Sequence, residues 1–336
     1  NDAYWHGLFG GLYLPHLRRA AWHSLAALEA RLDRLQPPPP LLRPDLDLDG
    51  RDEWLLTDGR VQAALRDDGF AAPHELLCYA LEHNFGDTLA RRAEAYHERI
   101  GAQTQHEREG GGIASAHDRV QSRHPISPAD LQTDAEPRAI AVDWLLAPGE
   151  EPLLLDAYRG MGAALPDAAV PPGQGRGAGT DGDEGGSPPA TRLAFEADVG
   201  GGHVRKRIGI GQGAILVEWE CTGLAGRRLR TRLNLALPSC DGFGGRYLLA
   251  DGSIPCGFGQ PLAIEAATAL TLDDRELDGW LRLECEPACR VAAAPLHTVS
   301  LSEGGFEKIM QAAVVDLVFP IEGERARLAL RLLPGR

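Results

Sequence analysis

The segment Asn1–Arg19, NDAYWHGLFGGLYLPHLRR, combines one carboxylate, a Tyr-Trp pair, two histidines, three glycines and two arginines. This mixture suits a sugar-binding surface, because a flat indole can cover the apolar face of a sugar ring while carboxylate and imidazole groups hydrogen-bond its hydroxyls. The same residues also fit a glycine-bearing loop that precedes a helix, with Trp5 in the core. The residues alone leave both interpretations open.

These nineteen residues resemble the last signature segment of the catalytic domain of glycoside hydrolase family 57, and are most similar to its 4-α-glucanotransferase and α-amylase branch. The resemblance implies that the segment closes a (β/α)7 barrel at its substrate cleft. It also implies that Asp2 and Trp5 contact the sugar, with His6 as a further substrate-binding candidate. The implied ligand is an α-glucan or a maltooligosaccharide.

The resemblance places the chemistry elsewhere in the family's sequence. The nucleophilic Glu and the acid/base Asp of the family lie on barrel strands before this segment, and this chain begins at Asn1. We therefore expect a C-terminal part of a longer retaining enzyme, with no catalytic residue of its own and no activity alone. Its expected partner is the N-terminal catalytic barrel.

Two later segments resemble the same family. Residues 84–97 (NFGDTLARRAEAYH) are similar to a stretch that ends in RR-x-E-x-YH, and residues 298–311 (TVSLSEGGFEKIMQ) are similar to a second C-terminal signature. In the first stretch, Arg91, Arg92 and Glu94 are suited either to binding a polyol or to an ion pair that joins domains. The sequence favours the ion pair without excluding the polyol edge.

An amphipathic helix is predicted after the signature segment. Leucines recur at spacings of three and four from Leu14 to Leu35, and Pro15 suits the first helical turn. The helix should end at Gln36, because Pro37–Pro40 cannot continue it and form a stiff, extended spacer. The chain is thus predicted to have three parts: the end of the catalytic barrel (1–36), a proline spacer (37–44) and a β-sandwich domain (45–336).

Many short strands are predicted after the spacer, among them Glu53–Thr57, Ile140–Leu146, Ala214–Thr222 and Trp280–Glu284. The chain has 40 Gly and 24 Pro, which favour turns, and Val217, Trp219 and Cys221 alternate with acidic residues as in a half-buried strand. We predict a mainly β fold with a large antiparallel β-sandwich, and the resemblance implies a galactose-mutarotase-like one. Residues 166–190 are low in complexity and are predicted to be a disordered insertion.

An acidic motif follows the spacer. Asp45, Asp47 and Asp49 alternate before Gly50, as at the start of an oxygen-rich calcium loop. Position 56 is Leu where such a loop has Glu, so Glu53 is the candidate fourth ligand. The alternative is a solvated, acidic hairpin turn without metal. A structural calcium is the one cofactor this sequence suggests.

Composition excludes some classes of partner. The formal net charge is −14, so neither a nucleic acid nor an anionic membrane surface is expected to bind. No apolar run is long enough to cross a bilayer. The six cysteines lack a CxxC pair and are interpreted as reduced structural thiols, which suits a cytoplasmic protein.

Three hypotheses for function follow. The first is the rear part of a 4-α-glucanotransferase, or of an α-amylase that hydrolyses the same glucan. The second is a carbohydrate-binding β-sandwich that holds glucan through exposed aromatic and acidic side chains. The third is a structural sandwich that stabilises the barrel and a homo-oligomer.

Overall fold

The computed structural model describes residues 3–4, 11–98, 100, 125–164, 191–302 and 305–336. Within them the fold is mainly β, with antiparallel sheets and one α-helix, which confirms the predicted fold class. The predicted insertion at 166–190 lies outside the described residues. None of the described helices has the length and apolarity needed to cross a membrane.

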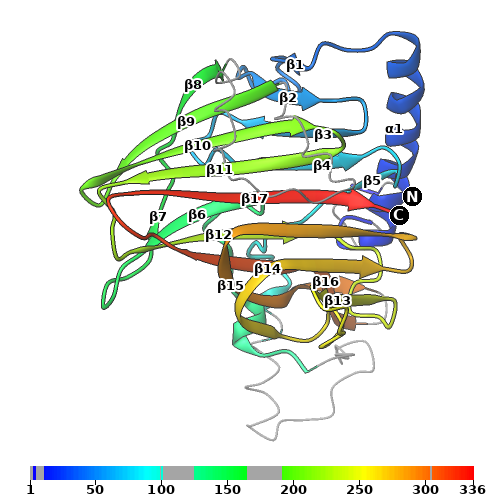
Figure 1. The fold of residues 1–336 in the computed structure, drawn as a ribbon. Helices are drawn as coiled ribbons and strands as arrows, with labels where there is room; N and C mark the ends of the chain where they lie inside the picture. Colours follow the sequence, from blue (N-terminus) through cyan, green and yellow to red (C-terminus); the bar gives the residue numbers. More distant parts are fainter. Residues whose placement is uncertain (1–2, 5–10, 99, 101–124, 165–190, 303–304) are drawn as a thin grey trace, which may run out of the picture.

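Helix α1 (Pro15–Leu35) confirms the predicted helix and its two ends. Proline is suited to the first position because its missing N–H has no partner there in any helix. Figure 1 shows α1 standing along one edge of the molecule. It packs through Trp22, Ala26 and Ala30 against Leu77 and Tyr79.

The predicted leucine stripe of α1 is not the face that contacts the sheet. Leu25, Leu28, Leu32 and Leu35 remain exposed by 47% to 84%. The face that packs against the sheet instead carries Trp22, Ala26 and Ala30, which follow one another at intervals of four residues. The amphipathic pattern therefore predicted the helix correctly, but its larger apolar face is open in this chain.

A first sheet of five strands follows α1, with neighbours in chain order. Its strands are β1 (Leu41–Leu42), β2 (Glu53–Thr57), β3 (Val61–Arg66), β4 (Pro73–Cys78) and β5 (His83–Asn84). Because β1 pairs with β2, the end of the proline spacer is itself an edge strand of this sheet.

A second sheet contains the other twelve strands. They are β6 (Ile140–Leu146), β7 (Leu153–Leu154), β8 (Arg159–Ala164), β9 (Thr191–Val199), β10 (Gly202–Gly211), β11 (Ala214–Thr222), β12 (Arg228–Leu235), β13 (Gly245–Leu249), β14 (Leu262–Asp274), β15 (Gly279–Ser302), β16 (Gly305–Pro320) and β17 (Arg325–Gly335). The main order is β7-β6-β12-β16-β15-β17-β11-β10-β9-β8, and β13 and β14 extend from β15. A short 3-10 helix, η1 (Pro128–Leu131), packs near β15.

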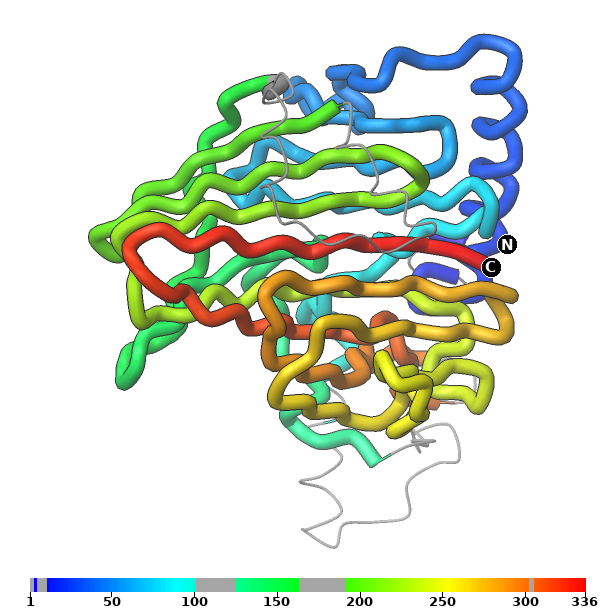
Figure 2. The backbone as a smooth tube through the Cα atoms, viewed as in Figure 1, coloured from blue at the N-terminus to red at the C-terminus, as the bar shows by residue number. Residues whose placement is uncertain are grey.

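The large sheet folds over on itself at β15. Residues Trp280–Glu286 of β15 pair with β17, whereas Arg290–Ser302 pair with β16, and Figure 2 shows the turn between them in orange. Lys206 of β10 lies 2.9 Å from Asp143 of β6, although five strands separate β6 from β10 in the sheet order. The two halves of the sheet therefore face each other as the layers of a sandwich.

One hydrophobic core joins both sheets. It contains Leu56 and Leu65 of the first sheet together with Trp219 and Phe319 of the large sheet. Both sheets therefore belong to one folding unit. All six cysteines are free thiols, and four of them are buried in this core or beside it.

The predicted strands agree closely with β2, β6 and β11, which have the expected bounds. The sequence did not predict β13 or β14, and it predicted only a fragment of the 24-residue β15. These strands lack the continuous alternation of apolar and polar residues that predicts a strand from the sequence.

Candidate functional site

The signature segment is attached to the sandwich by the part of it that the structure describes. The predicted sugar contacts Asp2, Trp5 and His6 lie outside the described residues. Tyr4 and the residues from Gly11 onward are described, and they show how the segment is held. The candidate site is therefore built from this attachment and from the cleft beside it.

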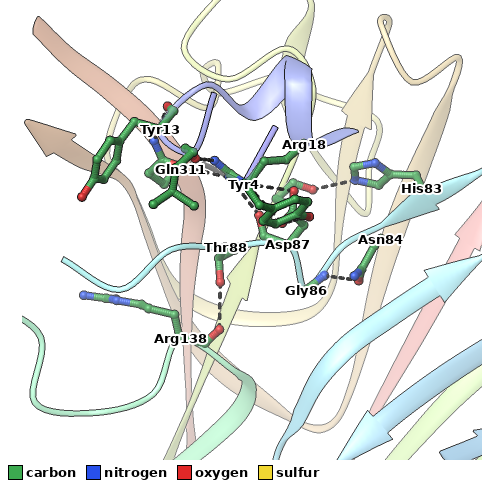
Figure 3. A network of polar contacts seen from close by, with 12 residues as sticks. Tyr4, Tyr13, Arg18, His83, Asn84, Gly86, Asp87, Thr88, Arg138 and Gln311 are labelled. Atoms are coloured by element: carbon green, nitrogen blue, oxygen red, sulfur yellow. Dashed lines mark hydrogen bonds and ion pairs between the residues drawn. The ribbon is translucent and has the colours of Figure 1, made fainter. Parts of the chain in front are cut away.

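Arg18 is the centre of the attachment, and its side chain is fully buried. Its Nε donates to both carboxylate oxygens of Asp87, each at 3.2 Å. Its Nη2 donates to Oε1 of Gln311 at 3.0 Å and to the Asp87 carbonyl at 3.2 Å, and its Nη1 donates to the Leu12 carbonyl. A buried guanidinium is tolerated because its donors are paired in this way. Figure 3 shows this arrangement.

Gln311 extends the network to a third segment. Its Nε2 donates to the Tyr13 carbonyl at 3.0 Å and to Oγ1 of Thr298 at 2.9 Å. On the other side, the Tyr4 hydroxyl donates to Asp87 at 3.3 Å. The network thus joins the three stretches that carry the family resemblance, which are far apart in the sequence.

A tight backbone turn places Asp87 under Arg18. Oδ1 of Asn84 accepts hydrogen bonds from the backbone N–H groups of Leu76, at 3.0 Å, and Gly86, at 2.9 Å. A Cβ atom on Gly86 would lie 2.3 Å from the His74 carbonyl oxygen, so only glycine fits here. The NFGD sequence is therefore needed to present the carboxylate of Asp87.

A shallow cleft, called the seam cleft below, opens beside this network. It lies between the signature segment, residues 91–97, η1 and the second half of β15. Its lining residues are Tyr13, Arg91, Arg92, Glu94, His97, Asp130, Leu131, Gln132, Thr298 and Val299.

Most polar groups of the seam cleft are held by neighbours. The Tyr13 hydroxyl donates to Glu94, Lys308 pairs with Asp130 at 2.6 Å, and Nε2 of His97 donates to the Val299 carbonyl at 3.1 Å. Arg92 lies exposed at the rim. These donors and acceptors are therefore held in fixed positions beside the aromatic ring of Tyr13.

Arg91 forms the ion pair that the sequence favoured, but its partner is not Glu94. Nη2 of Arg91 lies 2.7 Å from Asp134, whose carboxylate also contacts Arg138. Burial raises the pKa of Asp134, but hydrogen bonds from Arg138 and Arg91 outweigh burial and hold that pKa below its usual range. Arg138 continues to Asn234 at 3.0 Å, so this group of residues ties the 84–97 stretch to β12.

His83 is buried next to this turn. Its Nε2 donates to the Ala236 carbonyl at 2.9 Å, and its Nδ1 has no hydrogen-bond partner in the described structure. Burial lowers the pKa of His83 from 6.5 to about 4. The imidazole is therefore neutral in the folded protein at neutral pH.

We expect this histidine to make the fold sensitive to acid. Because the folded-state pKa is depressed, the stabilisation is fully present above pH 6.5 and is lost as the pH falls toward about 4. The expected loss is about 3 kcal/mol of unfolding free energy. Urea unfolding across this pH range measures it. In His83→Gln, which keeps an N–H donor but does not titrate, the slope should be smaller, and an unchanged slope would contradict the assignment.

The predicted acidic loop brings three of its four residues together. One carboxylate oxygen each from Asp45, Asp47 and Asp49 lies within 4.8 Å of the others. Backbone N–H groups of Asp49 and Gly50 donate to Asp45, and Gly50 has a φ of 89°. Glu53 does not join the three aspartates, since its carboxylate accepts a hydrogen bond from the Leu46 backbone N–H at 2.6 Å.

Arg18, Asp87 and Gln311 were missed as functional residues from the sequence. A charged residue in a surface helix is usually solvated, and Arg18 lies outside the leucine stripe. A usable signal existed, because Arg18 heads the row of residues spaced by four that continues with Trp22, Ala26 and Ala30.

Two family models match this chain. The model described as "Alpha-amylase/4-alpha-glucanotransferase, C-terminal" matches residues 45–332, and the corresponding middle-domain model matches residues 1–32.

Similar proteins carry related names. A 4-alpha-glucanotransferase of Thermococcus kodakarensis is 30% identical over 99% of this chain and 46% of its own length. An alpha-amylase of Pyrococcus abyssi is 26% identical over 96% of this chain and 45% of its own length. The crystal structure of the 4-alpha-glucanotransferase from Thermococcus litoralis superposes with a TM-score of 0.67 at 22% identity, covering 99% of this chain and 44% of that one. The chain spans about half the length of these relatives.

Proposed function

Because the chain belongs to the α-amylase/4-α-glucanotransferase family, we propose that it is the glucan-binding, non-chemical part of a retaining 4-α-glucanotransferase. The observation that carries this proposal is the Arg18 network, which fixes the signature segment to the sandwich. A segment that is held rigidly at a seam can position an indole and a carboxylate against a sugar. In this role Trp5 covers a glucose ring, and Asp2 and His6 hydrogen-bond its hydroxyls.

The chemistry of such an enzyme needs two further carboxylates. A retaining mechanism uses a nucleophile and an acid/base group about 5 Å apart. We assign neither to this chain and place both in the catalytic barrel of the family. In a transferase the glycosyl enzyme passes its glucan to a sugar acceptor. In an α-amylase, which is the alternative activity, it passes the glucan to water.

We propose that residues 1–36 complete the catalytic barrel, and that the spacer at 37–44 and the sandwich at 45–336 follow it. The open face of α1 supports this division, because four leucines at helical spacing are exposed there. An apolar stripe of this kind on a surface helix normally packs against another element. The match of residues 1–32 to a separate, middle-domain model agrees with this division.

The experiment uses this chain fused behind the part of the Thermococcus kodakarensis relative that precedes its matched region. The fusion should transfer glucosyl units between maltooligosaccharides, and the 336-residue chain alone should not. Trp5→Ala should lower kcat/KM of the fusion about 100-fold, because misplacement of the sugar removes oriented contacts in the transition state. Trp5→Phe is the matched control and should retain most of the activity.

Two results would overturn the proposal. One is turnover of starch by the 336-residue chain alone. The other is a Trp5→Ala fusion as active as the parent. Release of new reducing ends without transfer products would favour the α-amylase alternative.

We also propose that Asp45, Asp47 and Asp49 hold a structural calcium ion, because one carboxylate oxygen of each lies within 4.8 Å of the others. Calcium at 100 times its Kd should raise the free energy of unfolding by about 2.7 kcal/mol over a chelator-treated sample. Asp49→Asn should remove most of this gain, whereas Glu322→Gln, an exposed acid elsewhere, should not. Identical urea unfolding curves with calcium and with chelator would count against the site.

A further inference from the structure

Phe243 is the most exposed large apolar side chain of the described structure. Its ring is fully exposed, in the loop between β12 and β13. All other phenylalanines in the described ranges are buried or half-buried. A phenyl ring presented wholly to water is therefore unusual for this molecule.

The loop that carries Phe243 is held by hydrogen bonds at both ends. The carboxylate of Asp274, only 1% exposed, accepts from the backbone N–H of Ser239 at 2.9 Å and from its hydroxyl at 2.6 Å. The Gly242 N–H donates to the Ser239 carbonyl at 2.8 Å, and the Gly244 carbonyl accepts from the Arg275 N–H at 3.1 Å. The ring is therefore presented by an ordered turn, which lowers the entropy lost when a ligand binds.

Polar side chains flank the ring. Asp241, two residues before it, is 56% exposed, and a carboxylate oxygen lies 3.5 Å from Nε2 of His297. Arg275 is exposed and is hydrogen-bonded to this loop through its backbone. The loop that presents the ring thus carries a hydrogen-bond acceptor, Asp241, and is bonded to a residue with a donor side chain, Arg275.

We propose that Phe243 and Asp241 form an additional, non-catalytic binding site for an α-glucan chain. The apolar face of one glucose ring stacks on Phe243, and Asp241 accepts hydrogen bonds from its hydroxyls. The glucan class of the ligand rests on the proposed function. A single ring with polar surroundings matches a sugar better than a protein partner, because a stable protein interface buries about 800 Å2 on each side.

The site lies close to the seam cleft along β15. His297, which contacts Asp241, is two residues before Val299, and Val299 lines the cleft. Thr298, the residue between them, also lines the cleft, so β15 runs directly from His297 into it. A glucan bound at Phe243 would therefore be held near the seam, which raises its local concentration there.

The test is a calorimetric titration of maltoheptaose into the 336-residue chain carrying Trp5→Ala, so that the predicted Trp5 subsite does not contribute. We expect saturable binding that Phe243→Ala weakens about tenfold, because the stacking surface is lost. Phe243→Tyr keeps the ring and should bind like the parent. Ile254→Ala, a half-exposed apolar residue on another turn, is the matched control and should have no effect.

Three results would overturn the proposal. They are an unchanged affinity in Phe243→Ala, the absence of saturable binding, and a change in self-association with no change in maltoheptaose affinity. The last result would assign the ring to a contact between copies of the chain. The role of Trp5 is tested independently, through the fusion protein's transfer activity on short maltooligosaccharides. The Phe243 proposal and the proposed function can therefore fail separately.

Discussion

Replacing Arg18 with methionine is expected to destabilise the protein by about 3–5 kcal/mol, because it leaves a buried carboxylate without its cation. Asp87 is 12% exposed and Gln311 is 2% exposed, so neither recovers full hydration. The Leu12 carbonyl also loses its donor. Urea unfolding at neutral pH measures the loss, and amide exchange of residues 11–19 should rise in the same variant.

Two further variants separate charge from packing. Arg18→Met combined with Asp87→Leu should recover part of the loss, since no unpaired carboxylate remains. Arg18→Lys keeps the positive charge, but a single ammonium group cannot reach acceptors on all three segments. Its free energy of unfolding should therefore lie between those of the parent and Arg18→Met. A loss below about 1 kcal/mol in Arg18→Met would show that the network does not hold the segment.

Lys206→Met is expected to have an effect of similar size at the centre of the sandwich. Lys206 and Asp143 are both fully buried and lie 2.9 Å apart. The same Asp143 oxygen accepts from the Tyr158 hydroxyl at 3.0 Å and from Nε1 of Trp219 at 2.9 Å. Removing the ammonium leaves a buried carboxylate with two neutral donors, which costs about 3–5 kcal/mol.

The double variant Lys206→Met with Asp143→Leu is the control for this pair. Replacing both charges with apolar groups of similar size should be less destabilising than Lys206→Met alone. Burial lowers the pKa of Lys206, which Asp143 partly offsets, so the two residues depend on each other for their charges. A single variant as stable as the parent in urea would contradict this role.

Much of the fold could be predicted from local patterns. Prolines at 15 and 37 mark the ends of α1, and the alternation from Ala214 to Thr222 marks β11. β15 could not be predicted in full, because Pro287 lies inside it and proline normally argues against a central strand. The long strand forms because its two halves pair with different neighbours on either side of the bend.

The candidate site was less predictable, because contacts between distant residues define it. Arg18 meets Asp87 across 69 positions and Gln311 across 293, and no local pattern shows that a helix arginine is buried by such partners. The family resemblance marked the three segments separately but did not show that they meet. The roles of Asp2, Trp5 and His6 remain predictions, since these residues lie outside the described part of the chain.

The central claim is that the Arg18 network positions the glucan-binding segment. A double-mutant cycle of Trp5→Ala and Arg18→Met tests it most directly, through kcat/KM for maltooligosaccharide transfer by the fusion. If the network acts by placing Trp5, kcat/KM of the double variant should be about equal to that of the less active single variant. Effects that multiply independently would contradict the account.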